Sequence, residues 1–374
     1  MSLIRRKKIL VYGAGAIGRG YLPWVFSPTE FEYYYVERNP ELRVALSLAG
    51  QFTTKKTVRK GNEIIYQDLT VPITQCFAPG EEKDIIHKVE MVVTAVGPRN
   101  VFLLADSLNG TTMPVVCCEN DSTVSTLLGS ITGNPNIVFA VPDVITSNGS
   151  SEEMSKSNPL NIITEDGICY IDKRVAKIGG KAVYLSKNKL DKQWTAKLYL
   201  HNTSHCIAAY LGSLLGTHYV HEVMDIPSAR NIVAGAMGEM GEVLLKKFKM
   251  DEKFIIHYSS KELERFSNKF LFDPVSRVAR EPFRKLAPNE RLLGAAQLCL
   301  SAGVYPHFIM IGIMAAFFYN NPNDPDLNIQ YLIRSLVATD FLRIVLQLSP
   351  DQALHQLLLD HWENNRIILN TIHG

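Results

Sequence analysis

The chain has 374 residues, of which 46% are hydrophobic and 20% are charged, and its formal net charge at pH 7 is +2. These values are ordinary for a globular enzyme of two domains. Lysine and arginine are spread along the chain, so there is no electrostatic case for a nucleic acid or an anionic membrane as partner, and no apolar run of about 18 residues predicts a membrane span.

Near the N-terminus, a strand at 8–12 leads into a complete G-x-G-x-x-G turn at 13–18, followed by a helix and a second strand at 33–36. This arrangement is typical of dinucleotide-binding folds, in which each glycine has its own task. Gly13 permits the tight turn, Gly15 lets the main chain approach a pyrophosphate, and Gly18 lets the helix pack on the strand. The helix N-terminus then offers N–H groups to the phosphates.

An acid, Glu37, closes the second strand about 20 residues after the turn, where a carboxylate binds the adenosine ribose hydroxyls. This carboxylate would repel a 2′-phosphate, so NAD is favoured over NADP, although the neighbouring Arg38 keeps NADP as an alternative. The residues expected to contact the dinucleotide are Gly13, Gly15, Ala16, Ile17, Gly18, Glu37, Arg38, Thr94, Val96 and Gly97.

The first half of the chain alternates short β-like runs with helical or loop segments, which predicts a mostly parallel sheet. Expected strands lie at 64–66, 71–73, 89–96, 114–118, 136–141, 161–164 and 169–171. From about Asp191, helical periodicity takes over, with segments at 207–215, 233–248, 292–300, 308–319, 329–345 and 351–367. We therefore predict an α/β protein with a Rossmann-type NAD-binding domain at 1–190 and an all-helical substrate and catalytic domain at 191–374.

The cysteines give no sign of a disulfide scaffold. All six are scattered and none forms a C-x-x-C pair, which indicates reduced, mostly buried thiols. The basic N-terminal residues run directly into the first strand without the apolar segment of a signal peptide. We therefore expect a cytoplasmic protein.

A second group of polar residues, Lys197, Asn202 and His205, has the spacing K-x4-N-x2-H. On a continuous α-helix these side chains would fall within an arc of roughly 140°. Hydride transfer from a secondary alcohol needs a base for the hydroxyl proton and donors for the oxygen. A lysine can be that base, an amide can donate to the oxygen without titrating, and a histidine can hold the lysine or a substrate hydroxyl in place.

Two other interpretations of this segment remain open. In one, Asn202 caps a helix, Lys197 is solvated and His205 is an ordinary core histidine. In the other, His201 with His205, or His218 with His221, supplies zinc ligands. No H-E-x-x-H sequence accompanies these pairs, and we expect no metal.

Six ordered segments give the chain a resemblance to the polyol-specific long-chain dehydrogenase (mannitol dehydrogenase) family, and most closely to its sugar-phosphate branch. The resemblance runs over nearly the whole length. The segments lie at 13–20, 93–98, 118–120, 197–212, 277–286 and 303–307. Members of this family interconvert a polyol, or a related sugar acid, with its ketose by NAD(P) chemistry without metal.

The resemblance also implies roles for individual residues. Lys197 matches the general acid–base, Asn202 and Asn120 match the pair that polarises the reacting oxygen, and His205 matches the histidine that binds substrate beside the lysine. His201 stands where the family has an apolar residue, which leaves its role open.

A cationic cluster, Arg280, Arg284 and Lys285, lies in the segment that is similar to the sugar-phosphate branch. Guanidinium forks suit a phosphate dianion. We expect part of this cluster to bind a substrate phosphate. A solvated basic face, or a set of salt bridges, is the alternative.

The sequence therefore predicts an NAD-dependent, metal-independent oxidoreductase that interconverts a sugar-alcohol phosphate and its ketose phosphate, of the mannitol 1-phosphate and fructose 6-phosphate type. The alternatives are a reductase for a hexuronate such as fructuronate or tagaturonate, a dehydrogenase for a non-phosphorylated polyol, and a dinucleotide-binding regulator without turnover. The expected partner is a small sugar or sugar phosphate, and the expected state is a monomer or a weak homo-oligomer.

Overall fold

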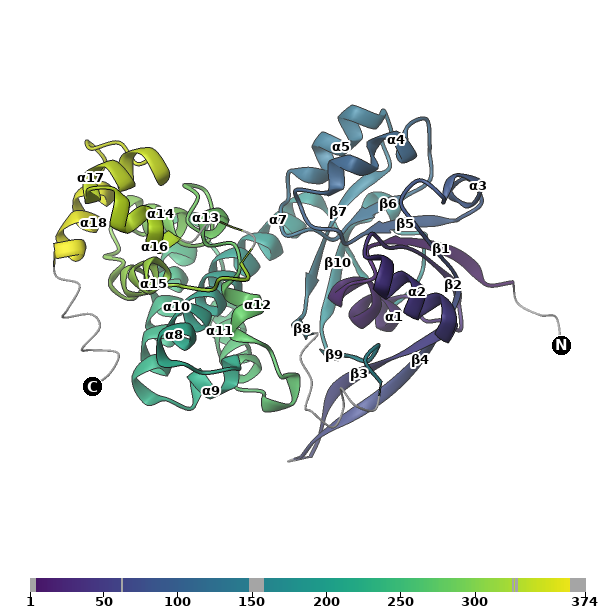
Figure 1. Cartoon of the computed structure of the whole chain (residues 1–374), viewed down its shortest axis with the longest axis horizontal. Coiled ribbons are helices and arrows are strands. Elements are labelled where there is room, and N and C mark those ends of the chain that lie inside the picture. Colours follow the sequence, from purple (N-terminus) through teal and green to yellow (C-terminus); the bar gives the residue numbers. More distant parts are fainter. Residues whose placement is uncertain (1–4, 62, 148–157, 325, 327–328, 364–374) are drawn as a thin grey trace. The chain divides into compact units, whose positions relative to one another are not determined.

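The computed structural model describes residues 5–61, 63–147, 158–324, 326 and 329–363 (Figure 1). The chain divides into two compact units, Met1–Trp194 and Thr195–Gly374. The division falls inside helix α7 (Lys187–Ala196). Each unit is described separately below.

The first unit is built on a sheet with the strand order β11-β10-β7-β6-β5-β1-β2-β4-β3-β9-β8. From β7 to β4 all neighbouring strands are parallel. The strands are β1 (Lys7–Tyr12), β2 (Phe31–Val36), β3 (Gln51–Lys60), β4 (Glu63–Phe77), β5 (Met91–Thr94), β6 (Val115–Cys117), β7 (Ile137–Asp143), β8 (Thr146–Ser147), β9 (Ile162–Glu165), β10 (Ile168–Asp172) and β11 (Val183–Leu185). This parallel centre confirms the predicted α/β class.

Apolar side chains cover both faces of the parallel centre, as the residues of β1 illustrate. Ile9 and Val11 point into one apolar cluster, while Leu10 and Tyr12 point into another on the opposite face. Successive side chains of a strand alternate between faces, so a strand covered on both sides reads as a continuous apolar run. The helical segments of this unit are η1 (Ala16–Tyr21), α1 (Leu22–Val25), α2 (Pro40–Ala49), α3 (Lys83–Ile86), η2 (Val101–Leu104), α4 (Ala105–Leu108), α5 (Val124–Thr132) and η3 (Lys173–Val175).

The edge of the sheet beyond β2 differs from the sequence prediction. The two short strands expected at 64–66 and 71–73 are parts of one long strand, β4, which pairs with β3 as an antiparallel hairpin. Sequence analysis predicted no strand for β3. Many side chains of this hairpin are exposed, so its sequence lacks the apolar runs that mark the buried strands.

All regular elements among the described residues of the second unit are helices, apart from one isolated β-bridge between Tyr219 and Pro274. Its segments are η4 (Lys197–Asn202), α8 (Thr203–Leu215), α9 (Val220–Met224), α10 (Pro227–Phe248), α11 (Glu252–Phe266), η5 (Lys269–Leu271), α12 (Val275–Ala279), α13 (Pro282–Lys285), α14 (Leu293–Ser301), α15 (His307–Phe317), α16 (Ile329–Ser335), α17 (Ala338–Asp340), η6 (Phe341–Val345) and α18 (Ala353–Glu363). Residues 364–367 of the predicted last helix lie outside the described part of the chain.

Helix α8 is the centre of the second unit. It is buried without interruption from Thr203 to Gly212, and it packs against α9, α10, α12 and α15. A Cβ on Gly312 of α15 would lie 2.4 Å from the Ile207 side chain of α8, so these two helices approach closely. Within the described residues, no helix combines the length and the apolar character needed to cross a bilayer.

The glycine-rich turn after β1 is fixed by contacts within the protein itself. Gly13 has φ +94°, and a Cβ added to it would lie 2.5 Å from the carbonyl oxygen of Ala95. A Cβ on Gly18 would lie 1.9 Å from the carbonyl oxygen of Gly13, whereas one on Gly15 would meet nothing within 4 Å. The fold therefore requires the first and third glycines, and the space beside Gly15 is left open.

These contacts predict effects of very different size on stability for two alanine substitutions in the same turn. Gly18→Ala forces the main chain to shift and should lower the free energy of unfolding by about 2 to 3 kcal/mol. Gly15→Ala is its matched control and should change stability by no more than about 0.5 kcal/mol. Urea denaturation of both variants measures the difference. Equal loss in the two variants would contradict this account of the turn.

Candidate active site

Two segments predicted to bind the cofactor, and the segment that contains the predicted catalytic residue Asn120, lie along one edge of the sheet. Gly13 follows β1, Gly97 lies just beyond β5, and Glu119 and Asn120 lie just beyond β6. These strands are neighbours and run parallel, so their carboxyl ends meet at the same edge. In open α/β sheets this edge is where ligands bind.

Glu37 reaches back from the end of β2 to the glycine-rich turn. Its Oε2 accepts a hydrogen bond from the N–H of Ala14 at 2.9 Å, and its Oε1 accepts one from the N–H of Asn39 at 2.8 Å. The carboxylate is therefore positioned beside the main chain that would hold a pyrophosphate. Arg38 is exposed.

Glu119 is a buried residue of this edge to which sequence analysis assigned no role. Its carboxylate accepts hydrogen bonds from the Thr94 hydroxyl at 2.7 Å and from the N–H of Val96 at 3.2 Å. Burial raises the pKa of Glu119 to about 7, although both hydrogen bonds act in the opposite direction. Glu119 thus ties the end of β6 to the end of β5, and its exposed neighbour Asn120 stands at the same edge.

The raised pKa of Glu119 predicts a specific dependence of stability on pH. Below its ordinary value of 4.5 the carboxyl is protonated in both folded and unfolded chains. As the pH rises from there to about 7, the unfolded chain loses the proton first, so folding loses about 3 kcal/mol. This loss is absent in Glu119→Gln, so the stability of the variant relative to wild type should increase between about pH 5 and about pH 8. Thermal or urea unfolding of both proteins across this range measures the difference. A difference in stability that does not change with pH would contradict the prediction.

In the second unit, Lys197 and Asn202 begin and end the π-helical segment η4, which joins α7 to α8. The arc predicted for an α-helix is therefore not the geometry present, because π-helical hydrogen bonds run from i to i+5 instead of i+4. Single π-turns within α-helices are frequent at functional sites. The pattern of hydrogen bonds within one turn cannot be recognised from residue spacing.

Both ends of this π-turn are buried. Lys197 and Asn202 are each 6% exposed, so the lysine is not a solvated surface side chain. Asn202 makes no side-chain capping hydrogen bond at the start of α8, and its Nδ2 is a buried donor without a hydrogen-bond partner among the described residues. An unsatisfied buried donor is costly and requires an explanation. A ligand oxygen is the kind of acceptor that would satisfy it.

His205 is held by a carboxylate from the segment before α12. Its Nε2 lies 2.8 Å from Oδ2 of Asp273, and the Arg277 guanidinium binds the same carboxylate. Although burial disfavours the charged form of Asp273, Arg277 and His205 lower its pKa to about 2. The ring of His205 also stacks on Phe266, with centroids 4.9 Å apart and planes 9° apart. His205 is therefore fixed in both tautomer and orientation.

His201 has a parallel arrangement of its own. Its Nδ1 contacts Oε2 of Glu262, and Arg265 contacts the other oxygen of that carboxylate. Glu262 is completely buried, and the rings of His201 and His205 lie 5.1 Å apart. Sequence analysis assigned no role to Glu262, Arg265 or Asp273, because no spacing relates them to η4.

The three cations of the expected phosphate cluster lie in different surroundings. Arg280 is exposed. Arg284 pairs with Glu281 at 3.0 Å, and its Nη1 has no hydrogen-bond partner among the described residues. Lys285 is buried and donates to the carbonyl oxygens of Val278 and Arg280. Because Lys285 is buried and its Nζ is bound to these carbonyls, it serves the main chain more than a surface ligand. Burial also lowers the pKa of Lys285 to about 7.

The described residues bear on the alternative of a zinc site formed by the histidine pairs. Among those residues, no group of three or more histidine, cysteine, aspartate or glutamate side chains is arranged to hold an ion. Nδ1 of His201 and Nε2 of His205 each face a carboxylate. Each of these carboxylates also binds an arginine.

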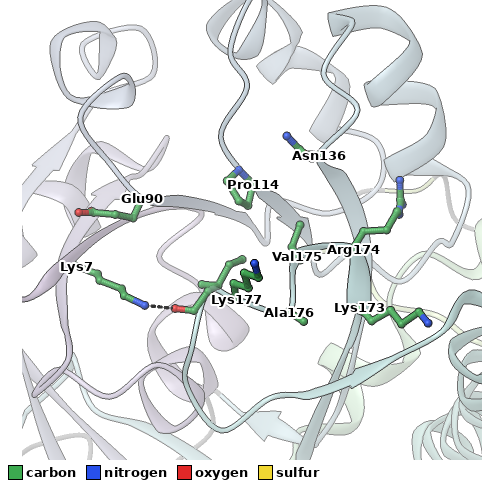
Figure 2. A pocket seen from close by; sticks show the side chains of 10 residues that line it. Lys7, Glu90, Pro114, Asn136, Lys173, Arg174, Val175, Ala176 and Lys177 are labelled. Carbon is green, nitrogen blue, oxygen red and sulfur yellow. Dashed lines mark hydrogen bonds between the residues drawn. The ribbon is translucent and has the colours of Figure 1, made fainter.

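The first unit also contains a pocket of about 480 Å³, which is not the dinucleotide site (Figure 2). Lys7 begins β1, and Glu90, Pro114 and Asn136 immediately precede β5, β6 and β7. The pocket therefore lies at the amino ends of the strands, opposite the glycine-rich edge. The Lys7 ammonium donates to the carbonyl oxygen of Ile178 at 2.6 Å across it.

Comparisons with known proteins agree with the motifs and the fold. Residues 189–335 match the family model of the mannitol dehydrogenase C-terminal domain. A mannitol-1-phosphate 5-dehydrogenase of an Exiguobacterium species is 28% identical over 95% of this chain and 97% of its own length. The mannitol-1-phosphate 5-dehydrogenase of Clostridium acetobutylicum is 28% identical over 85% of this chain and 88% of its own length.

Two solved structures resemble this chain over almost its whole length. Pseudomonas fluorescens mannitol 2-dehydrogenase, in a ternary complex with NAD and D-mannitol, has a TM-score of 0.76 at 14% identity and covers 99% of this chain and 94% of its own. A D-sorbitol dehydrogenase in substrate-free form has a TM-score of 0.63 at 12% identity and covers 98% of this chain and 92% of its own. At these identities the likeness establishes the fold.

The fold and the matches define a class of protein: an oxidoreductase with a Rossmann-type fold that acts on CH–OH groups. The chain contains a match to the mannitol dehydrogenase C-terminal domain at 189–335, and its predicted resemblance to the mannitol dehydrogenase family is confirmed.

Proposed function

We propose that this chain is an NAD-dependent, metal-independent dehydrogenase that interconverts mannitol 1-phosphate and fructose 6-phosphate, or a close analogue of that pair. The observation that carries the proposal is the π-turn η4, which presents a buried lysine and a buried, unpartnered amide donor on one element. A secondary alcohol needs both groups as it becomes a ketone. The phosphorylated substrate is suggested by the names of the relatives.

Each residue of η4 and α8 then has a distinct task. Lys197 takes the hydroxyl proton during oxidation and returns it during reduction. The Nδ2 of Asn202 donates to the reacting oxygen as negative charge develops there. His205, whose Nε2 is committed to Asp273, uses its other nitrogen for a substrate hydroxyl. For Asn120, the role of second donor to the oxygen rests on the resemblance alone.

The cofactor of this reaction is NAD. When bound, its nicotinamide supplies the hydride acceptor. The turn residues fit such a dinucleotide, because the space beside Gly15 is open and Glu37 lies at the turn. A carboxylate at this position disfavours the 2′-phosphate of NADP. The remaining contacts are proposed for Gly13, Ala16, Ile17, Gly18, Arg38, Thr94, Val96 and Gly97.

Removing the proposed base should stop turnover without removing the cofactor site. Lys197→Ala should lower kcat about a hundred- to ten-thousand-fold, because general-base catalysis contributes that much. NADH binding, followed by fluorescence, should stay close to wild type. Lys187→Ala, which removes an exposed lysine paired with Asp191, is the control. Turnover close to normal in Lys197→Ala would take the lysine out of the mechanism.

The phosphate of the substrate is assigned to Arg280 and Arg284, because Lys285 already serves main-chain carbonyls. Arg280→Ala and Arg284→Ala should raise KM for a phosphorylated ketose far more than they lower kcat, since they remove binding common to ground and transition states. Arg343→Ala, a change in another arginine of the second unit, is the control. Unchanged KM in both variants would refute the phosphate role.

The direct test of the proposed function is NADH oxidation by the purified chain with fructose 6-phosphate, and with fructose in parallel. Rapid loss of NADH with the phosphate alone is the expected result. Loss with fructuronate or tagaturonate instead would favour hexuronates, whose carboxylate the same arginines can bind. Loss with fructose alone would indicate a non-phosphorylated polyol. Binding of NADH without turnover on any of these would favour a dinucleotide-binding regulator.

A further inference from the structure

We propose that the pocket at the amino ends of the strands is a second ligand site of the first unit, and that it binds an anion that carries phosphate groups. Its volume of about 480 Å³ lies within the range of small-molecule sites in proteins. No step of the proposed reaction uses this pocket, so the inference goes beyond the proposed function.

Four cationic side chains line the pocket. Lys7 begins β1, and Lys173, Arg174 and Lys177 lie on η3 and the turn that follows it. In Figure 2, Lys177 lies near the middle of the labelled side chains. Cations that come from separate segments and line one hollow create a positive potential there, and this potential attracts anions.

The charges of the three lysines are not cancelled by acids. The Lys7 ammonium donates to a neutral main-chain carbonyl, and neither Lys173 nor Lys177 has an ion-pair partner among the described residues. Glu90 is the one acid among the described residues of the lining, and its Oε2 accepts a hydrogen bond from the N–H of Lys8 at 2.5 Å. The lining therefore carries an excess of positive charge, and lysine is a common ligand of phosphate groups.

Arg174 has a different part in the pocket, because other groups of the protein hold it in place. Its Nε lies 3.0 Å from Oδ2 of Asp172, and its Nη1 donates to the carbonyl oxygen of Pro135 at 3.3 Å. Asp172 balances its charge, so Arg174 fixes the position of the segment more than it adds to the net charge. The lysines are the groups assigned to the anion.

The segment that carries the lysines is anchored to the core. Val175 and Ile178 are buried in the same apolar cluster as Ile9 and Val11 of β1. The main chain between Lys173 and Lys177 is thus held at the sheet by its apolar side chains. A site whose main chain is fixed before the ligand arrives loses less conformational freedom on binding.

This pocket is separated from the glycine-rich turn by the length of the strands. Lys7 and Tyr12 are the two ends of β1, and a strand of six residues spans about 20 Å. The cations of the pocket therefore cannot be contacts for the pyrophosphate of a dinucleotide bound at the turn. The ligand of this pocket is a separate molecule.

The test is calorimetric titration of the full chain, kept saturated with NADH so that the dinucleotide site is occupied. Inorganic pyrophosphate is the probe in one series and ADP in another. The double variant Lys173→Gln/Lys177→Gln should raise the dissociation constant about ten-fold or more, because two charge-assisted contacts are lost. In wild type, bound anion should also slow hydrogen exchange of the main-chain amides at 173–178.

The two probes distinguish the sources of the phosphate. Tighter binding of ADP than of pyrophosphate would identify an organic phosphate as the ligand, whereas equal binding would identify an inorganic one. The matched control is Lys187→Gln/Lys189→Gln, which removes two exposed lysines outside the pocket and should bind both probes like wild type. Arg280→Ala should also bind like wild type, which separates this site from the proposed substrate site.

Three results would overturn the proposal. They are an unchanged affinity in Lys173→Gln/Lys177→Gln, unchanged hydrogen exchange at 173–178 with anion bound, and dissociation constants of wild type beyond the millimolar range for both probes. All of these are measurements of binding, so the absence of turnover with every polyol phosphate would refute the proposed function and leave this inference standing.

Discussion

The constraint on which the second unit depends is the cost of burying ionisable groups in one helical stretch. Lys197, His201 and His205 are all less than one-tenth exposed, and a charge removed from water is tolerated only when it is paired. Glu262 of α11 and Asp273, just before α12, supply acidic partners for the histidines, and the arginines one helical turn further on balance those acids. These partners come from separate segments, so the packing of α11 and α12 around η4 and α8 creates the fold and the site together.

Among the paired charges of this segment, the amide of Asn202 is buried at the end of the π-turn, and its Nδ2 has no hydrogen-bond partner among the described residues. The hydroxyl of the nearby Ser204 is also buried without such a partner. A buried donor that is left without a partner among paired charges can bind a ligand oxygen. Lys285, in contrast, is a buried donor with partners, because its ammonium donates to the main-chain carbonyls of Val278 and Arg280.

The first unit obeys a steric constraint instead of an electrostatic one. Gly13 and Gly18 have no room for a side chain because strand ends and turn meet there, whereas the space beside Gly15 is open. Glu37 and Glu119 then fix the turn and the end of β5 through main-chain N–H groups. The two acids thus hold different parts of this edge, and burial raises the pKa of Glu119 to about 7.

Local periodicity and short motifs were sufficient to predict the α/β class and the glycine-rich turn after the first strand. The same kind of local pattern led to the predictions of helices from about residue 190 and of Lys197, Asn202 and His205 as site residues. It could not predict the exposed hairpin of β3 and β4, whose pattern lacks buried runs, or the π-turn, whose hydrogen bonding leaves no trace in residue spacing. The contacts of Glu262 with His201 and of Asp273 with His205 join residues more than sixty positions apart, and they could be found only in the folded structure, as could the burial of Lys285. Long-range pairing of buried charges is set by how helices pack, and packing is not encoded in any local segment.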